Sequence, residues 1–468
     1  MTLYTNPTSQ APTPLAASIG ALLCLPALSA IGATHTVNNC QDAGTGSLRA
    51  VITAATTHSG DTLDLTTLMC STISLKTGIN VAQNNLTLNG PGENQLTLTD
   101  YAATKHRIFR HTGSGTLAIH NMSISNGYAG ASASAPASKG GCISSAGNVN
   151  LDHVRLSGCV ANGTSQATGG GIYARYQISL QHSTISGNTV STTAPGGLAL
   201  GGGAAAHDFI ASDSSAVNNS ALGDYAAGGG GLYVKANLTL TASTVSGNHT
   251  DGIGGGARVG RGAFLYSMPP AVKINNSTIS GNDASTYVGG VFSEFSVTLQ
   301  NSTIAFNTAG SGNYSSTGHT YFVGAGLVAV GPRVHSVVLQ SSLLANNTYG
   351  FTDEDSDFST FTRSGPAITV SGADNLIRYA HGPEPTGTLH ACPLLGPLRD
   401  NGGETKTHAL LSHSPGIDVG NNNAGFADDQ RRSPFVRKYG IAADIGAYEV
   451  QADIIFDNGF DGCPLLPI

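Results

Sequence analysis

ISLQHSTISGN (Ile178–Asn188) is one of eight copies of an eleven-residue phrase in this chain. The other copies begin at Leu117, Val149, Phe209, Leu238, Val272, Val297 and Val337, so successive copies start 25 to 40 residues apart. A repeat of roughly 30 residues with inserts of variable length is typical of a solenoid. Positions 1, 3 and 8 of the phrase are apolar, whereas positions 2 and 4 are mostly polar. This alternation predicts β-strands rather than helices.

Two polar positions hold the same residue type in six consecutive copies. Position 6 is serine, at Ser183, Ser214, Ser243, Ser277, Ser302 and Ser342. Position 11 is asparagine, at Asn188, Asn219, Asn248, Asn282, Asn307 and Asn347. A residue type that recurs once per repeat predicts a ladder of stacked side chains, in which asparagine amides can hydrogen-bond from coil to coil. Gly127 and Cys159 replace asparagine in the two earliest copies, so we expect the regular solenoid between about Gly169 and Asn347.

A glycine cluster and a short strand precede each phrase, as in GGGIYAR from Gly169 and GGGLYVK from Gly229. Two or three strands per coil, glycine corners and no helical period predict a parallel β-helix. This all-β fold is shared by pectate lyases, polygalacturonases and non-enzymatic adhesins, so the fold alone assigns no activity.

The N-terminal region predicts export from the cytoplasm. Leu15–Ile31 is apolar and precedes small residues, which favours a secretory signal peptide over residues 1–33, with an uncleaved apolar tail as the alternative. No later stretch approaches about 18 continuous apolar residues, so we expect no membrane span. After the signal, Ser47–Gly60 predicts a short amphipathic helix that caps the solenoid.

Six cysteines remain after the signal peptide. Neighbouring coils of a solenoid contact one another, and distant coils do not. Among the 15 possible pairings, this favours the disulfides Cys40–Cys70, Cys142–Cys159 and Cys392–Cys463.

Several segments resemble known families of secreted bacterial proteins. Val37–Gly92 is similar to CSLREA-type N-terminal regions, with SLRA where that family has SLREA. Pro393–Asn421, the DQRR of Asp429–Arg432 and the ADIGAYE of Ala443–Glu449 resemble the choice-of-anchor Q domain. The tail at Ile454–Gly462 resembles a short tail of exported proteins, and the glycine-rich repeats are similar to those of polymorphic outer-membrane proteins. Together these resemblances imply a right-handed β-helix exported from a Gram-negative bacterium, without an assigned reaction.

The chain therefore divides into five expected parts. They are a signal peptide (1–33), an N-terminal cap with the first coils (34–100), the β-helix repeats (101–391), a choice-of-anchor Q-like region (392–450) and a C-terminal tail (451–468).

Outward-facing residues after the glycine clusters form a candidate glycan-binding stripe. Arg175, His207 and Lys235 occupy the same position in three successive coils. The column two residues earlier contains Tyr173, Tyr233, Arg258 and Phe292. Basic and aromatic side chains on one face can bind an acidic polysaccharide by charge and by stacking on sugar rings. A solvated face without a ligand is the alternative interpretation.

The sequence therefore predicts a monomeric, secreted or cell-surface β-helix that acts in adhesion or glycan contact without catalysis. The alternative is a polysaccharide lyase for a uronate-containing glycan, in which the basic stripe would supply the base and neutralise the carboxylate. A net charge of −7 argues against nucleic acid as a partner. We expect no cofactor, although Asp353, Glu354, Asp355 and Asp357 form an acidic run that is a candidate Ca²⁺ site, with a solvated loop as the alternative.

Overall fold

The computed structural model describes Thr2 and residues 32–55, 60–101, 105–132, 136–224, 226–260, 269–310, 324–350, 354–362 and 367–451. The chain divides into two compact units, Met1–Ile31 and Gly32–Ile468. The second unit contains every described helix and strand, and residues 3–31 of the predicted signal peptide and the tail after residue 451 lie outside the described residues.

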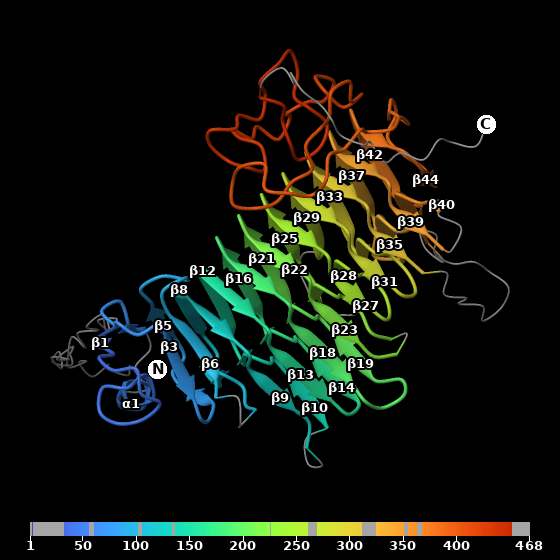
Figure 1. Ribbon diagram of the computed structural model, residues 1–468. Coiled ribbons are helices and arrows are strands. Elements are labelled where there is room, and N and C mark those ends of the chain that lie inside the picture. The colour runs from blue at the N-terminus through green and yellow to red at the C-terminus, as the bar shows by residue number, and fades with distance from the viewer. Residues whose placement is uncertain are drawn as a thin grey trace. The chain divides into compact units, whose positions relative to one another are not determined.

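The second unit is a stack of coils held together by parallel strand pairing (Figure 1). A 21-stranded sheet, here called the wide sheet, contributes two strand columns that pair from coil to coil. Its first column is β1 (Thr34–Thr36), β2 (Asp61–Asp64), β5 (Leu86–Asn89), β8 (Thr116–Ser125), β12 (Asn148–Ser157), β16 (Gln177–Gln181), β21 (Asp208–Ser212), β25 (Leu238–Thr241), β29 (Ala271–Asn275), β33 (Ser296–Gln300), β37 (Ser336–Gln340) and β42 (Thr369–Ala373). Its second column is β3 (Thr72–Leu75), β6 (Thr97–Asp100), the ends of β8 and β12, β17 (Thr184–Ser186), β22 (Ser215–Val217), β26 (Thr244–Ser246), β30 (Thr278–Ser280), β34 (Thr303–Ala305), β38 (Leu343–Ala345) and β43 (Leu376–Ile377).

Three further sheets complete the coils. The 11-stranded groove sheet follows the glycine clusters and contains β4 (Ile79–Val81), β7 (Phe109–His111), β11 (Ile143–Ser145), β15 (Ile172–Ala174), β20 (Ala204–Ala206), β24 (Leu232–Val234), β28 (Ala257–Val259), β32 (Val291–Ser293), β36 (Leu327–Val330), β41 (Phe358–Phe361) and β44 (Ala380–His381). A nine-stranded sheet contains β9 (Tyr128–Gly130), β13 (Val160–Gly163), β18 (Thr189–Thr192), β23 (Ser220–Leu222), β27 (His249–Thr250), β31 (Asp283–Ala284), β35 (Thr308–Ala309), β39 (Thr348–Tyr349) and β40 (Glu354–Asp355). A three-stranded sheet contains β10 (Ala137–Lys139), β14 (Gln166–Thr168) and β19 (Leu198–Leu200). The predicted parallel β-helix is confirmed, since all pairings between these strands are parallel except that of β39 with β40.

The asparagine column forms a continuous hydrogen-bonded ladder inside the coils. Each amide Nδ2 donates to Oδ1 of the asparagine in the next coil at 2.8–2.9 Å, and the backbone N–H of the same residue donates to the same oxygen. The ladder ends at Asp357, whose carboxylate accepts from both nitrogens of Asn347 and from the backbone of Tyr379. The serine column also links the coils, because each Oγ accepts a hydrogen bond from a backbone N–H of the preceding coil.

The fifth residue of the phrase, which precedes the ladder serine in the six coils that have one, turns the chain between the two columns of the wide sheet. It has a positive φ of 43–54° in eight coils, at Asn121, His153, His182, Asp213, Ala242, Asn276, Asn301 and Ser341, which we call the corner column. This left-handed conformation is uncommon outside glycine, and asparagine, aspartate and histidine are enriched in it.

The third glycine of each cluster faces the ladder asparagine. A Cβ at Gly231 would lie 3.0 Å from the Asn248 side chain and 2.6 Å from the carbonyl oxygen of Gly256. Where the ladder starts, Cys142 and Cys159 occupy the glycine and asparagine positions and form a disulfide instead. The predicted disulfides Cys40–Cys70 and Cys142–Cys159 are thus confirmed, and Cys392 is also disulfide-bonded, although Cys463 lies outside the described residues.

A short helix closes the first coils, as predicted. Helix α1 (Leu48–Ala54) begins at Ser47, whose Oγ accepts the backbone N–H of Ala50 at 3.3 Å. Leu48 and Ile52 are buried against the apolar interior of the coils. In the described part of the chain, no helix has the length and apolar character needed to cross a bilayer.

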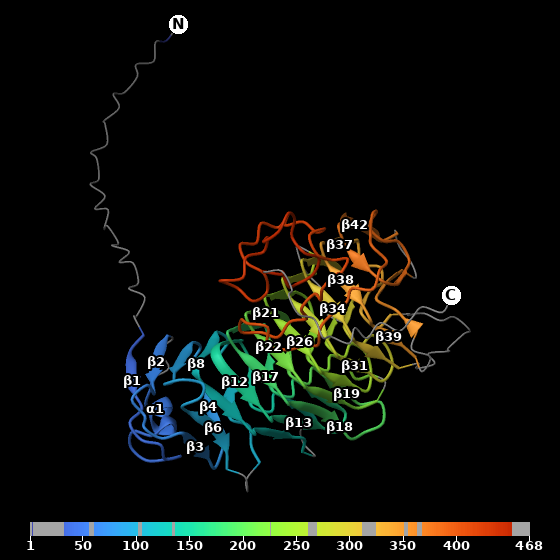
Figure 2. The same cartoon turned by 45° about the horizontal axis from the view of Figure 1, so that its top comes forward.

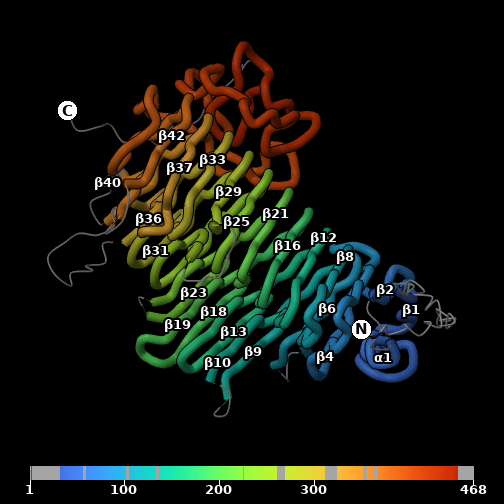
Figure 3. The backbone as a smooth tube through the Cα atoms, turned by 180° about the vertical axis from the view of Figure 1, so that it is seen from behind, coloured from blue at the N-terminus to red at the C-terminus, as the bar shows by residue number. Residues whose placement is uncertain are grey.

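The C-terminal region (residues 392–450), here called the strap, folds back along the outside of the coils (Figures 1 and 2). It reaches from β37 towards β16, and the view from behind shows it beside the same edge of the wide sheet (Figure 3). Its contacts follow the corner column: His182 meets Glu404, Asp213 meets Arg432, Asn276 meets Asp428, and Asn301 meets Asn421. The strap therefore covers the second column of the wide sheet, where the outward residues of β26, β30 and β34 are buried.

Candidate functional site

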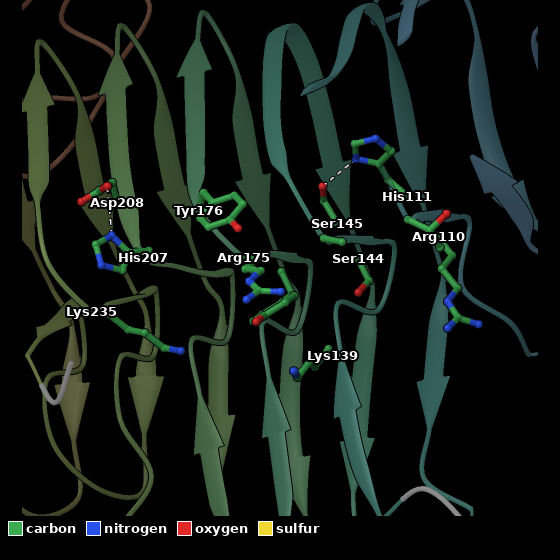
Figure 4. Close-up of a pocket in the computed structure, with 13 residues that line it drawn as sticks. Arg110, His111, Lys139, Ser144, Ser145, Arg175, Tyr176, His207, Asp208 and Lys235 are labelled. Atoms are coloured by element: carbon green, nitrogen blue, oxygen red, sulfur yellow. Dashed lines mark hydrogen bonds and ion pairs between the residues drawn. The ribbon is translucent and has the colours of Figure 1, made fainter. Parts of the chain in front are cut away.

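A groove of about 820 Å³ runs across five coils on the groove sheet (Figure 4). Its lining comes from the strands of that sheet and from the residues that follow them. The lining residues are Arg110, His111, Thr112, Lys139, Ser144, Ser145, Ala146, Tyr173, Arg175, Tyr176, His207, Asp208 and Lys235. The structure thus brings together four of the seven predicted stripe residues, namely Tyr173, Arg175, His207 and Lys235.

One basic side chain comes from each successive coil of the groove. Arg110, Lys139 and Arg175 are exposed, and His207 and Lys235 are half-buried. Strand pairing fixes this order, because Arg110 is the partner of Ser144 and Ser144 is the partner of Tyr173. Coils stack about 4.8 Å apart, so Arg175, His207 and Lys235, which share one register position, follow the axis of the coils with that spacing. Arg110 lies two positions earlier in the register, and Lys139 ends β10 of the three-stranded sheet.

The groove has a positive charge although the chain as a whole is acidic. Asp208 is the one carboxylate among the described lining residues, and it is already paired. Its Oδ2 lies 3.0 Å from Nδ1 of His207, and its Oδ1 accepts two hydrogen bonds from Asn237. Arg110, Lys139, Arg175 and Lys235 therefore dominate the local field, in contrast with the net charge of −7.

Two tyrosines accompany these cations. The ammonium of Lys139 lies 4.8 Å from the ring centroid of Tyr173, and the guanidinium of Arg175 lies 5.5 Å from that of Tyr176. Tyr176 is 46% exposed, so its ring offers a platform for a sugar face.

The other three residues of the predicted stripe are buried, which corrects the expectation of an exposed column. Tyr233, Arg258 and Phe292 pair in the predicted register, but their exposed fractions are 4%, 3% and 6%. Tyr233 packs against Leu200 of the preceding insert, and Arg258 donates to the carbonyl oxygens of Ala226 and Ala227. Phe292 packs with Tyr287, Val288 and Val328. The segments that lead into the glycine clusters thus cover these coils and end the groove at Lys235.

Sequence reasoning missed Arg110, Lys139 and Tyr176. Arg110 belongs to a coil without a triple-glycine cluster, so nothing in the sequence marks its register with Tyr173. Lys139 ends β10, which lies in an insert. Tyr176 directly follows Arg175, and this adjacency was the one available signal for it.

A buried His–Ser pair lies beneath the groove. Nδ1 of His111 is 2.7 Å from Oγ of Ser145, and Nε2 of His111 faces the carbonyl oxygen of Gln83 at 2.9 Å. Burial lowers the pKa of His111, so its imidazole is neutral at pH 7. Both side chains are at most 2% exposed, so Ser145 is inaccessible as a nucleophile and the pair ties two coils together.

The candidate Ca²⁺ run is also corrected by the structure at Asp357. This residue is fully buried and its carboxylate terminates the asparagine ladder, so it is not a ligand in a solvated loop. Asp353 and the side chains of Glu354 and Asp355 lie outside the described residues. Within the described residues, no group of three or more His, Cys, Asp or Glu side chains is arranged to hold a metal ion.

No family model matches the chain, and no curated protein matches it. Among solved structures, the chain is similar to the crystal structure of pectate lyase Pel9A, with 12% sequence identity and a TM-score of 0.44 over 90% of this chain and 98% of that chain. The parallel β-helix of this chain rests on its own strand pairings.

Proposed function

We propose that the chain is an exported β-helix protein that contacts acidic glycans through the basic groove, without catalysing a reaction. The observation that carries the proposal is the row of basic side chains, one per coil, from Arg110 to Lys235. Concentrated positive charge on an acidic protein attracts polyanions to that groove and leaves the rest of the surface repulsive. The disulfides indicate an extracellular or periplasmic protein, where acidic glycans occur and nucleic acid is not a normal partner.

The geometry favours a glycan that lies along the coil axis. The spacing of about 4.8 Å between coils is close to the length of one sugar unit in an extended chain. A glycan that carries carboxylates can therefore meet Lys139, Arg175 and Lys235 in turn, while Tyr176 stacks on a sugar ring. Ionised donor–acceptor pairs of this kind are stronger than neutral hydrogen bonds.

Binding to defined polysaccharides tests the proposal. Calorimetric titration with polygalacturonate and alginate, with neutral dextran as the comparison, should show binding to the polyuronates alone. Loss of two cations in Arg175→Ala/Lys235→Ala should weaken it by about tenfold or more. Lys273→Ala removes an exposed cation on the wide sheet and serves as the matched control. Equal binding by the double variant and the control would remove the groove from the proposal.

One feature favours the second candidate function, a polysaccharide lyase. The imidazole of His207 is oriented by Asp208 and lines the groove together with Arg175 and Lys235. A carboxylate beside Nδ1 favours the tautomer in which Nδ1 carries the proton and Nε2 is the basic nitrogen, and the cations would neutralise a uronate carboxylate. Unsaturated products would absorb in the ultraviolet, and His207→Gln would abolish their formation while weakening glycan binding less than Arg175→Ala/Lys235→Ala does. A flat absorbance trace with every polyuronate would eliminate this candidate.

The strap and the cellular location belong to the same proposal. We assign residues 392–450 to the choice-of-anchor Q domain on the motifs DQRR and ADIGAYE, and we place the protein in the medium or on the cell surface. N-terminal sequencing of the exported protein should give a start near residue 34. An intact Met1 on the exported form would contradict a cleaved signal.

A further inference from the structure

Two histidines of the corner column lie side by side on adjacent coils, at the end of the strap. His153 lies within β12, and His182 directly follows β16; the residues before them, Asp152 and Gln181, are paired. The two ring centroids are 4.7 Å apart with an interplanar angle of 29°. Both have a positive φ, of 52° and 45°, which turns the side chains outward from the coils. Their side chains are 53% and 27% exposed, so solvent reaches both rings.

A carboxylate holds one nitrogen of each ring. Oδ1 of Asp152 lies 2.8 Å from Nδ1 of His153, and Oε2 of Glu404 in the strap lies 2.5 Å from Nδ1 of His182. An ionised carboxylate can only accept a hydrogen bond, so Nδ1 of each ring carries a proton, and in the neutral form of the ring Nε2 has the lone pair. Within the described residues, neither Nε2 atom has a hydrogen-bond partner.

We propose that His153 and His182 bind a transition-metal ion such as Zn²⁺ through their Nε2 atoms. Histidines that ligate metals usually donate their other N–H to a carboxylate, which sets the tautomer and raises the basicity of the ligand. Both rings already have this arrangement before any metal binds. Imidazole suits zinc, copper and nickel, whereas Ca²⁺ and Mg²⁺ prefer oxygen ligands.

The surroundings favour a cation at this position. Asp152 and Glu404 flank the pair, and Asp213 occupies the next place in the corner column and interacts electrostatically with His182. Among the described residues of this region, Arg432 is paired with Asp213, and Arg155, two residues after His153, is paired with Glu93. His120 adds a third imidazole on the far side of Asp152, whose Oδ2 lies 3.3 Å from His120 Nδ1.

The site is a pair of donors and not a closed cage. The two rings are stacked, so a shared ion requires them to turn until both Nε2 atoms point at one position, with water at the remaining places. Four-coordinate zinc would thus have two protein ligands and two water molecules here. Because Glu404 belongs to the strap, a bound ion would also tie the end of the strap to β12 and β16.

Titration of the full chain, purified without a histidine tag, tests the proposal. We expect one equivalent of Zn²⁺ by calorimetry, with displaced ¹⁵N resonances of Nε2 in His153 and His182. Asparagine occupies the same corner at Asn276 and Asn301, so His153→Asn and His182→Asn keep a backbone conformation that the fold already uses. Each should weaken Zn²⁺ binding by more than about tenfold, since even outer-shell partners of ligating histidines contribute about 10–100-fold.

His413→Asn is the matched control, because His413 is also exposed and has a φ of 65°. It should bind Zn²⁺ like the unaltered protein, and unchanged circular dichroism without metal should confirm that all variants fold. Asp152→Ala leaves both ligands in place and should weaken binding by about 10–100-fold. Unaltered Zn²⁺ affinity in His153→Asn/His182→Asn, or Ca²⁺ affinity equal to that for Zn²⁺, would overturn the proposal.

Discussion

At the turns of this protein, asparagine side chains form the hydrogen bonds between coils that backbone groups form in the strands. Each ladder asparagine makes three kinds of hydrogen bond. Its Nδ2 donates to the asparagine of the next coil and to a backbone carbonyl oxygen, and its Oδ1 accepts two N–H groups from the asparagine of the preceding coil. For Asn248 these partners are Asn282, Asn219 and the carbonyl oxygen of Ala216. Buried polar groups are costly without partners, so the turn is stable only as long as the column is unbroken.

Replacement of Asn248 by alanine should therefore cost more than one hydrogen bond. Asn248→Ala leaves both nitrogens of Asn219 and the Ala216 carbonyl without their partner in a fully buried turn. We expect a loss of about 2–4 kcal/mol in the free energy of unfolding. Urea unfolding measures it, with Asn150→Ala on the exposed face of β12 as the control. A loss below that of the control would show that water enters the turn and replaces the amide.

At the scale of one coil, the Cys142–Cys159 disulfide substitutes for a glycine–asparagine pair. The backbone N–H of Cys159 still donates to Oδ1 of Asn188 at 2.9 Å, so the ladder and the disulfide meet in the same register. The position before it is Gly127, whose N–H faces the sulfur of Cys142. The coil that starts the ladder is thus closed covalently, because the preceding coil has Gly127 in place of an asparagine amide.

The double replacement Cys142→Gly/Cys159→Asn should extend the ladder by one coil. The introduced amide would donate to Asn188 and accept the N–H of Gly127, as at every later coil. Under reducing conditions this variant should unfold at a higher urea concentration than the reduced native chain, because its free energy of unfolding should be larger by about 1 kcal/mol. Without reductant the order should reverse, since the native disulfide closes a loop and contributes about 3 kcal/mol. Cys142→Ser/Cys159→Ser is the control. Equal free energies of unfolding for the two double variants would show that an asparagine adds to the ladder only between two asparagine neighbours.

The strap carries a buried histidine that makes its attachment depend on pH. Burial lowers the pKa of His408 from 6.5 to about 4, with Nε2 against Oγ of Ser280 on β30. As the pH falls below about 6.5, His408 becomes protonated in the unfolded strap, whereas in the folded strap it stays neutral until about pH 4. Folded stability is therefore lost on acidification across this window, by up to about 3 kcal/mol.

Hydrogen exchange of residues 392–450 at pH 7 and pH 5, corrected for intrinsic rates, should show faster opening of the strap at pH 5. His408→Gln has no titratable group at this position, so its strap should open at the same rate at pH 7 and pH 5. His413→Gln, in an exposed part of the same strap, should behave like the native chain. A pH effect that survives in His408→Gln would assign it to other groups.

The repeating strands and the short N-terminal helix were predictable from the sequence, whereas the contacts made by the inserts and by the strap were not. The register that aligns Tyr233, Arg258 and Phe292 follows from the glycine clusters, because pairing in a solenoid is local. Their burial depends on segments whose length and sequence do not repeat from coil to coil. The repeat therefore predicts that these side chains point outward, but it does not predict that they are covered. The contact of His182 with Glu404 spans 222 residues and leaves no mark in either segment.

For the molecule as a whole, the strap joins coils that otherwise touch only their neighbours. Its own core is ionic: Arg431 lies between the rings of Phe435 and Tyr448, at 3.9 and 3.8 Å from their centroids, and is bonded to Asp429. The fully buried Arg437 pairs with Glu449 at 2.9 Å. These residues account for the DQRR and ADIGAYE motifs, which hold the strap together.

Removal of the Arg437 charge should release the strap and leave the first coils intact. Arg437→Met leaves the carboxylate of Glu449 buried without its partner, and burial already raises the pKa of that carboxyl. The expected cost is about 3–5 kcal/mol. It should fall on residues 392–450 and on β26, β30 and β34 beneath them, where hydrogen exchange should accelerate. Strands β2, β5 and β8 lie outside the strap contacts and should keep their protection, as should every element in the control Lys438→Met, whose side chain is exposed. Uniform acceleration along the whole stack would instead mean that strap and coils unfold as one cooperative unit, in conflict with the nearest-neighbour coupling of a solenoid.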